Sequence, residues 1–124
     1  MIKQFLLVGL GGALGSMLRY LCSIFIVQKN FPFTTLLVNV FGSFIIGIVL
    51  AFCLKNELFA NNWKLFLATG ICGGFTTFST FSVENLQLIE NQKWALLCLY
   101  VLSSIVLGIA AVFLGFKTIN FLSD

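Results

Sequence analysis

The centre of the chain carries the stretch Gly70-Ile71-Cys72-Gly73-Gly74-Phe75-Thr76-Thr77-Phe78-Ser79-Thr80-Phe81-Ser82. It lies in an uncharged segment, residues 65–83, whose length of about 20 residues suits a bilayer crossing. A glycine pair and clustered hydroxyls disfavour a continuous helix. A membrane tolerates a helix break only where protein or a polar cavity satisfies the freed backbone groups. The stretch therefore predicts a broken membrane helix that contributes to a transport site.

Composition places the chain in a membrane. Hydrophobic residues make up 60% of the 124 residues and charged residues 9%, whereas soluble domains carry about 25% charge. We therefore predict an all-α integral membrane protein with a single transmembrane domain over residues 1–124. The formal charge is only +3, and the seven basic residues are scattered singly, so we expect no nucleic-acid partner.

Charged and turn residues divide the chain into four predicted transmembrane helices, the third of them broken at its centre. Their approximate ranges are residues 4–28, 32–54, 64–91 and 93–117. The first apolar stretch is longer than the core of a signal peptide and has no clear small-residue cleavage site after it. We expect this segment to be retained as a membrane helix.

The basic residues give little preference for either orientation in the membrane. One side would collect Lys3, Lys55, Lys64 and Lys117, and the other would have Lys29 and Lys93, with or without Arg19. So weak a bias under the positive-inside rule permits insertion in both orientations, a dual topology; the alternative is a single orientation with the N-terminus inside. Because four short helices can hardly enclose an aqueous pore, we also expect an oligomer, with small-xxx-small spacings such as Gly70 and Gly74 at helix contacts.

Catalytic and metal-binding residues are scarce. The four cysteines lie one per apolar segment and the chain has no histidine, so zinc and redox motifs lack their ligands. We interpret the cysteines as small buried hydrophobic residues. The few carboxylates cannot form a Ser-His arrangement or a paired-acid site within the membrane. We therefore expect no enzymatic activity.

The polar side chains inside the apolar spans are mainly hydrogen-bond donors. Asn39 carries a carboxamide about one-third of the way into the second helix. Hydroxyls follow in the third and fourth segments, on Thr76, Thr77, Ser79, Thr80, Ser82, Ser103 and Ser104. Each hydroxyl could instead bind a carbonyl of its own helix, and the asparagine could simply join two helices. Their concentration around a broken helix favours an ion pathway.

The sign of the permeant ion follows from these donors. No carboxylate lies in the middle of a span, as a cation site would require. Hydroxyl and amide donors suit an anion, as do the electropositive edges of phenylalanine rings. Phe78 and Phe81 are three residues apart and would share one helix face, and Phe75 continues the spacing; the alternative is that these rings only pack. The residues predict a small-anion pathway without distinguishing fluoride from chloride.

Two charged residues flank the predicted pathway. Arg19 lies far into the first span, where its side chain must snorkel or bind carbonyls and hydroxyls. It either draws anions into a vestibule or ties a helix end to a loop. Glu84 follows the Phe/Thr cluster, and we predict that it lies at the mouth of the vestibule and tunes anion entry.

Three motifs together resemble the Fluc (CrcB) family of small fluoride channels over nearly the whole chain. They are Gly11-Gly12-Ala13-Leu14-Gly15-Ser16-Met17-Leu18-Arg19-Tyr20, Thr35-Leu36-Leu37-Val38-Asn39-Val40-Phe41-Gly42-Ser43-Phe44 and Gly73-Gly74-Phe75-Thr76-Thr77-Phe78-Ser79-Thr80-Phe81. The third motif is the most specific. The resemblance implies a fluoride-selective channel that forms an antiparallel, dual-topology homodimer with two pores, each built from both subunits.

The resemblance also implies residue roles. Asn39 would be the pore amide, Phe78 and Phe81 would present ring edges to fluoride, and Ser79 and Thr80 would supply nearby hydroxyls. In the fourth helix, Tyr100 and Ser104 would begin a polar track, although Gly108 and Val112 carry no hydroxyl on the following turns. The backbone carbonyls of Gly73 and Thr76 would hold a structural sodium ion on the two-fold axis of the dimer.

The implied physiology is relief from fluoride in a bacterial inner membrane. Hydrogen fluoride enters as a neutral acid and dissociates, and the membrane potential then drives the trapped anion out through a passive channel. One rival is a small dual-topology multidrug exporter, which needs a membrane-embedded acid that the first helix lacks. A second rival is a non-transporting membrane subunit that assembles with a larger partner.

Overall fold

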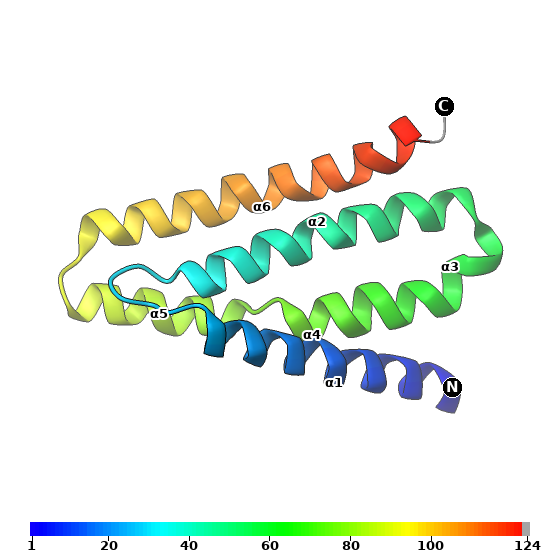
Figure 1. The fold of residues 1–124 in the computed structure, drawn as a ribbon, viewed down its shortest axis with the longest axis horizontal. Coiled ribbons are helices and arrows are strands. Elements are labelled where there is room, and N and C mark those ends of the chain that lie inside the picture. Colours follow the sequence, from blue (N-terminus) through cyan, green and yellow to red (C-terminus); the bar gives the residue numbers. More distant parts are fainter. Residues whose placement is uncertain (123–124) are drawn as a thin grey trace.

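The computed structural model describes residues 1–122, apart from the side chains of Leu58 and Phe59. It consists of four helical crossings that run side by side in alternating directions (Figure 1). Three crossings are continuous helices: α1 (Ile2–Phe25), α2 (Phe33–Lys55) and α6 (Trp94–Leu122). The third crossing is assembled from α3 (Glu57–Trp63), η1 (Lys64–Cys72), α4 (Gly73–Phe75) and α5 (Phe78–Glu90).

All four crossings are long and apolar enough to span a membrane. They are Ile2–Phe25, Phe33–Lys55, Ala60–Glu90 and Trp94–Leu122. Residues 1–122 contain no β-strand. The predicted class, an all-α multi-pass membrane protein whose third crossing is irregular, is therefore confirmed.

The helix ends differ from the expected ones where a charge was taken as a boundary. α6 continues past Lys117 to Leu122, with the Lys117 ammonium 5.6 Å from the centroid of the Phe113 ring. A charged residue can thus end the apolar run while the helix continues past it. α1 ends three residues earlier than the expected end at residue 28, because the backbone of Ile26 is extended (φ −98°, ψ 105°).

The helices pack in two pairs. α2 lies along α6, and α1 lies along η1 and α4 (Figure 1). Glycines permit the close approach of α2 and α6: a Cβ at Gly47 would overlap the Val112 carbonyl oxygen, and one at Gly115 would overlap that of Phe44. Small residues at such crossings let backbones of membrane helices come into contact.

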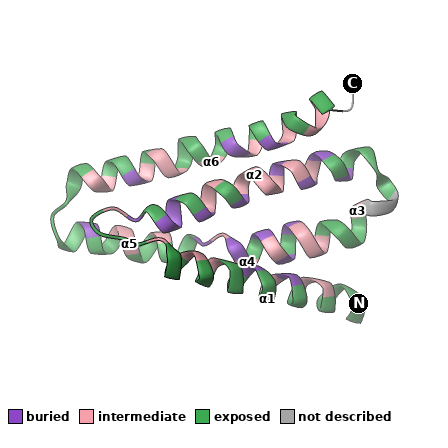
Figure 2. Cartoon of the chain, in the orientation of Figure 1, coloured by how far each residue is buried: buried purple, intermediate pink, exposed green. Residues whose placement is uncertain are grey.

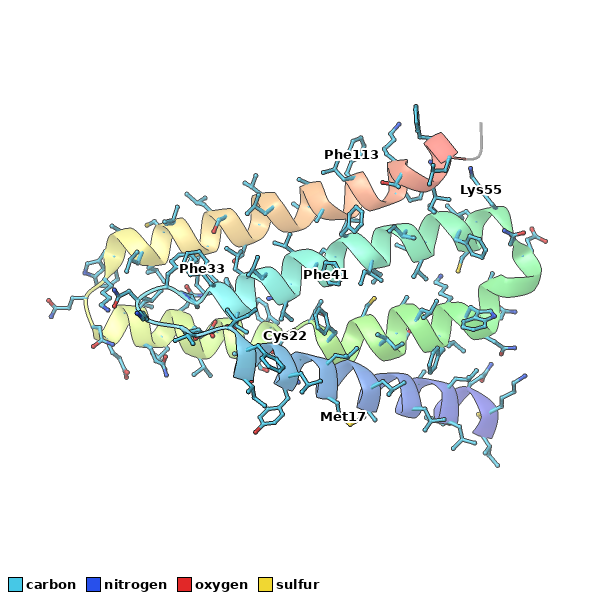
Figure 3. The ribbon with its side chains drawn as sticks, viewed as in Figure 1. Met17, Cys22, Phe33, Phe41, Lys55 and Phe113 are labelled. Carbon is cyan, nitrogen blue, oxygen red and sulfur yellow. The ribbon has the colours of Figure 1, made fainter. Side chains whose placement is uncertain are left out.

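Much of the outer surface is apolar. Only 11% of the most apolar stretch of α1, and likewise of α6, is buried within the single chain, and exposed segments predominate on both helices (Figure 2). Phe113, for example, projects from the outer side of α6 with 59% of its surface exposed (Figure 3). Surfaces this apolar require contact with lipid or with another protein surface.

The two ends of the bundle have different connections. Both termini and α3 lie at one end, and the α1–α2 loop and the α5–α6 turn lie at the other (Figure 1). At the first end the Lys55 ammonium donates a hydrogen bond to the Ile119 carbonyl oxygen (3.4 Å), which ties α2 to α6 (Figure 3).

The tight turn between α5 and α6 contains a residue with a strained backbone, which leads to a prediction about stability. Gln92 has φ 55°, in the left-handed region that costs an ordinary residue about 1 kcal/mol. Gln92→Gly should remove this strain and raise the free energy of unfolding by up to about 1 kcal/mol, measured by thermal unfolding in detergent. Asn91→Gly, one residue earlier at φ −85°, is the matched control and should not stabilise the protein. Equal stabilisation by both variants would contradict the prediction.

Candidate functional site

The third crossing is interrupted at two threonines. Thr76 (φ −76°, ψ 157°) and Thr77 (φ −150°, ψ 120°) have extended backbones, and α5 begins immediately afterwards at Phe78. The preceding Gly73 keeps helical angles (φ −63°, ψ −39°). The glycine pair is thus not itself the break: a Cβ at Gly74 would overlap the Gly12 carbonyl oxygen, so this glycine serves close packing against α1.

Asn39 on α2 holds the interrupted backbone in place. Its Oδ1 accepts a hydrogen bond from the Thr77 N–H (2.8 Å), and its Nδ2 donates one to the Thr77 carbonyl oxygen (3.1 Å). This double contact fixes the orientation of the amide, because only Oδ1 can accept from a backbone N–H. One of the two N–H groups on Nδ2 is left for another acceptor.

Several carbonyl groups lose their helical donors at the break, and those of Gly73 and Thr76 are among them. In a continuous α-helix the Gly73 carbonyl would accept from the Thr77 N–H, and the Thr76 carbonyl from the Thr80 N–H. The Thr77 N–H instead binds Asn39, and the Thr80 N–H binds Thr77 Oγ1 (3.1 Å). The oxygens of Gly73 and Thr76 therefore remain as acceptors, and backbone acceptors inside a membrane need partners.

Hydroxyls gather at the start of α5. Thr77 Oγ1 lies 3.1 Å from Thr80 Oγ1, to which it donates, and 3.3 Å from Ser79 Oγ. Thr77 also caps α5, because the same oxygen accepts from the Thr80 N–H. The break thus brings together three of the hydroxyls that were predicted to line the pathway.

The cap predicts a measurable loss of stability. Thr77→Val keeps the shape of the side chain but removes the cap of α5, and should lower the free energy of unfolding by about 1 to 2 kcal/mol. Thr77→Ser keeps the hydroxyl and should lose less than half as much. Thermal unfolding in detergent measures both, and equal losses would show that the hydroxyl does not matter.

Two cavities meet at Thr77. One, of about 320 Å³, is lined among others by Asn39, Ser43, Gly73, Thr76, Thr77 and Phe78; we call it the amide cavity. The other, of about 610 Å³, is lined among others by Ser16, Arg19, Thr35, Thr77, Thr80 and Glu84; we call it the vestibule cavity. Thr77 therefore lines both cavities, and the Asn39–Thr77 pair lies between them.

The phenylalanines do not form one continuous row. Phe78 and Phe81 lie together on α5, with ring centroids 5.7 Å apart, and Phe78 is 79% exposed. The expectation that Phe75 continues this row is wrong. Its ring is buried and packs edge-on against Phe41 (6.3 Å). The extended residues after Phe75 break the helical register, so spacing by three does not place its ring on the face of the other two.

Glu84 joins three helices beside the vestibule cavity. Its Oε1 accepts from the Thr35 hydroxyl (2.7 Å) and its Oε2 from the Tyr100 hydroxyl (2.6 Å). Tyr100 has no exposed surface and also contacts the Phe81 ring (5.0 Å between centroids). Thr35 was missing from the predicted site. Its position one helical turn before Asn39 on α2 is the signal that could have indicated it.

The Ser43 hydroxyl of α2 lies close to Gly108 on α6, one helical turn after Ser104. Ser104 Oγ is buried and has no hydrogen-bond partner among the described residues. One turn later, a Cβ at Gly108 would lie 3.9 Å from Ser43 Oγ. Ser43 thus brings a hydroxyl near the position where α6 has none, and it too was not among the predicted pathway residues.

Comparison with known proteins places this arrangement in a family. Residues 6–116 match the family model described as CrcB-like protein, Camphor Resistance (CrcB). The chain belongs to the CrcB family. The match includes residues from all four crossings and the whole of the break between α4 and α5.

Relatives within the CrcB family are similar over almost their full length. A protein of Azobacteroides pseudotrichonymphae genomovar. CFP2 is 47% identical, over 98% of this chain and 99% of its own. Proteins of Oceanobacillus iheyensis and Thermus thermophilus are each 43% identical, over 94% of this chain and 91% and 93% of their own. All three relatives are named fluoride-specific ion channel FluC. These relatives are thus named for ion conduction, which is not an enzymatic activity.

Proposed function

We propose that this protein is a fluoride-selective channel that lets fluoride leave the bacterial cytoplasm passively across the inner membrane. The observation that carries the proposal is the Asn39–Thr77 pair between two cavities of a CrcB-family chain. The names of the relatives support fluoride as the permeant ion.

Donors follow one another along the proposed path. An anion in the vestibule cavity would be close to Arg19 and Thr80, which both line that cavity. Near the Asn39–Thr77 pair it would meet the remaining N–H of Asn39 and the ring edges of Phe78 and Phe81, whose quadrupoles favour negative charge. The Ser79 hydroxyl lies beside this point. Beyond the vestibule cavity, these amide, hydroxyl and ring-edge groups replace part of the hydration shell without a fixed positive charge.

The Glu84 carboxylate lies beside this path but is already hydrogen bonded. Hydroxyls of Thr35 and Tyr100 donate to its two oxygens. The positive ends of these two hydroxyl dipoles point at the carboxylate and partly offset its repulsion of a passing anion. In this proposal Tyr100 acts by holding Glu84, and Ser104 continues the polar track along α6.

The proposal includes an antiparallel homodimer formed by oppositely inserted copies. Two features of the single chain support it. Phe78 is 79% exposed at the centre of a membrane crossing, and the amide cavity beside it is lined by residues of only two crossings, α2 and the third. A second copy would supply the missing wall of each path, so that a dimer would hold two pores.

We also propose a structural sodium ion at the break. Residues 1–122 hold no cluster of three His, Cys, Asp or Glu side chains, and the proposed ligands are backbone oxygens. Gly73 and Thr76, whose carbonyls have lost their helical donors, both line the amide cavity. Hard cations prefer such oxygens. In a dimer the two copies would contribute four carbonyls, and a bound sodium ion would supply the positive charge that joins them.

Expression in bacteria that lack other fluoride exporters tests the proposed function. Cells that make the wild-type chain should retain less fluoride and grow at higher external fluoride than cells that make Phe81→Ile. Equal fluoride retention in both strains, with both proteins present in the membrane at equal levels, would contradict the proposal.

Thiol labelling tests the two orientations separately. A Lys3→Cys variant in which the four native cysteines are replaced by alanine should react with an impermeant reagent from both sides of the membrane. Labelling from one side only would exclude dual insertion. It would not contradict the fluoride assignment, which the flux assays test.

The position of Ser43 beside Gly108 leads to a prediction about fluoride efflux. If its hydroxyl compensates for the glycine at position 108, Ser43→Ala should lower fluoride efflux about tenfold, which corresponds to about 1.4 kcal/mol for one lost hydrogen bond. Ser103→Ala on α6 is the matched control, because the Ser103 hydroxyl donates to the Tyr100 carbonyl of its own helix (3.2 Å). Efflux that falls equally in both variants would argue against a special role for Ser43.

A further inference from the structure

A third cavity lies at the end of the bundle away from the termini, between the α1–α2 loop and the α5–α6 turn (Figure 1). Its volume is about 210 Å³. Its polar lining consists mainly of two lysines and four carboxamides: Lys29, Lys93, Gln28, Asn30, Gln87 and Asn91. The proposed anion path uses none of these six residues, so their gathering in one cavity calls for a separate explanation.

The charge of this cavity favours an anion. Lys29 and Lys93 contribute two positive charges, and neither forms an ion pair with a described residue. The carboxylate of Glu84 also lines the cavity, which leaves one net positive charge. Its two oxygens already accept the hydroxyls of Thr35 and Tyr100. Ammonium and carboxamide N–H groups remain, and this combination of donors suits the oxygens of a phosphate group.

The walls of the cavity are held by the fold. Phe31 in the α1–α2 loop packs against Phe33 (4.7 Å between centroids) and edge-on against the buried Tyr100 (5.5 Å). On the opposite wall the Lys93 N–H donates to the Leu88 carbonyl oxygen (2.9 Å). Ring contacts of Phe31 therefore anchor the loop that carries Lys29, and a backbone hydrogen bond anchors Lys93.

The surroundings of the cavity are apolar and aromatic. Phe25, Phe33 and Trp94, which are within a few residues of the lining in sequence, are 79%, 54% and 57% exposed. Phe33 lies at the start of α2 beside the loop (Figure 3). Exposed aromatic rings at helix ends mark the boundary between hydrocarbon and headgroups. An occupant with an anionic head and acyl chains matches both parts of this surface.

We propose that this cavity binds the phosphate headgroup of an anionic glycerophospholipid, with Lys29 and Lys93 as its principal cationic contacts. Basic pockets between membrane helices bind such headgroups, and each lysine near an anionic headgroup contributes a several-fold gain in affinity. The proposal depends only on the membrane location of the chain and not on the identity of the permeant ion.

Native mass spectrometry of the purified full chain tests the proposal, with phosphatidylglycerol and phosphatidylcholine as probes. Wild-type protein should retain phosphatidylglycerol in preference to phosphatidylcholine. The double variant Lys29→Gln/Lys93→Gln should bind phosphatidylglycerol roughly 30-fold more weakly. The matched control, Lys3→Gln/Lys64→Gln, removes the same charge at the other end of the bundle and should bind as the wild type does.

Three results would overturn the proposal. One is an equal loss of phosphatidylglycerol in both double variants, which would indicate general charge attraction. Another is equal retention of the two lipids by the wild type. The third is displacement of phosphatidylglycerol by inorganic phosphate at similar concentration, which would assign the cavity to free phosphate. Since no arm measures fluoride flux, failure here is distinguishable from failure of the channel assignment.

Discussion

Asn39→Asp is expected to lower fluoride efflux about a thousandfold. The substitution replaces the donor that binds the Thr77 carbonyl with a carboxylate oxygen, and places a negative charge where the two cavities adjoin. Repulsion between two like charges about 4 Å apart costs about 4 kcal/mol at an effective dielectric constant of about 20. A barrier raised by this amount slows passage by about three orders of magnitude.

The matched control for this variant is Asn91→Asp. Asn91 is exposed at the end of α5, where its Nδ2 donates to the Gln87 carbonyl oxygen (2.7 Å). The same chemical change at that position should alter efflux by less than twofold. Size-exclusion chromatography should give both variants the elution volume of the wild type. Retention of most efflux by a folded Asn39→Asp protein would remove the Asn39–Thr77 pair from the path.

Gly15→Ala should be the most destabilising single methyl addition in α1. A Cβ at this position would overlap the Ile71 carbonyl oxygen and lie 2.8 Å from the Phe75 N atom. Both neighbours are backbone atoms, so α1 must move away from η1 and α4. We expect a loss of about 3 kcal/mol or more in the free energy of unfolding, the upper range for overpacked sites, measured by thermal unfolding in detergent.

Gly9→Ala in the same helix is the control for this substitution. A Cβ at Gly9 meets nothing within 4 Å, and alanine favours a helix over glycine by up to about 1 kcal/mol. This variant should be neutral or slightly more stable than the wild type. If Gly15→Ala proves as stable as Gly9→Ala, α1 does not pack against the third crossing as described.

The sequence was sufficient to predict the membrane class and the four crossings. Length and apolar composition determine both, because a bilayer core of about 30 Å demands about 20 apolar residues per helix. The helix ends were less predictable. Lys117 ends the uncharged run, but hydropathy does not report where backbone hydrogen bonding ends, and α6 continues to Leu122.

The irregular crossing was predicted, but not its local geometry. Glycines and hydroxyls indicated a break near the middle of the span, whereas the contacts that place it at Thr76 and Thr77 come from a distant helix. Asn39 is 38 residues away in sequence from Thr77, and only the fold shows that its amide binds both the N–H and the carbonyl of Thr77. For the same reason spacing alone misplaced Phe75 and gave no indication of the bond between Thr35 and Glu84.

Ion efflux from liposomes that contain only this protein tests the channel assignment most directly. With potassium fluoride inside and valinomycin added to carry the compensating charge, fluoride should leave rapidly. Chloride efflux under the same conditions should be far slower, and fluoride should stay inside when valinomycin is omitted. Absence of fluoride efflux, equal loss of chloride, or movement of cations strictly coupled to protons would contradict the account.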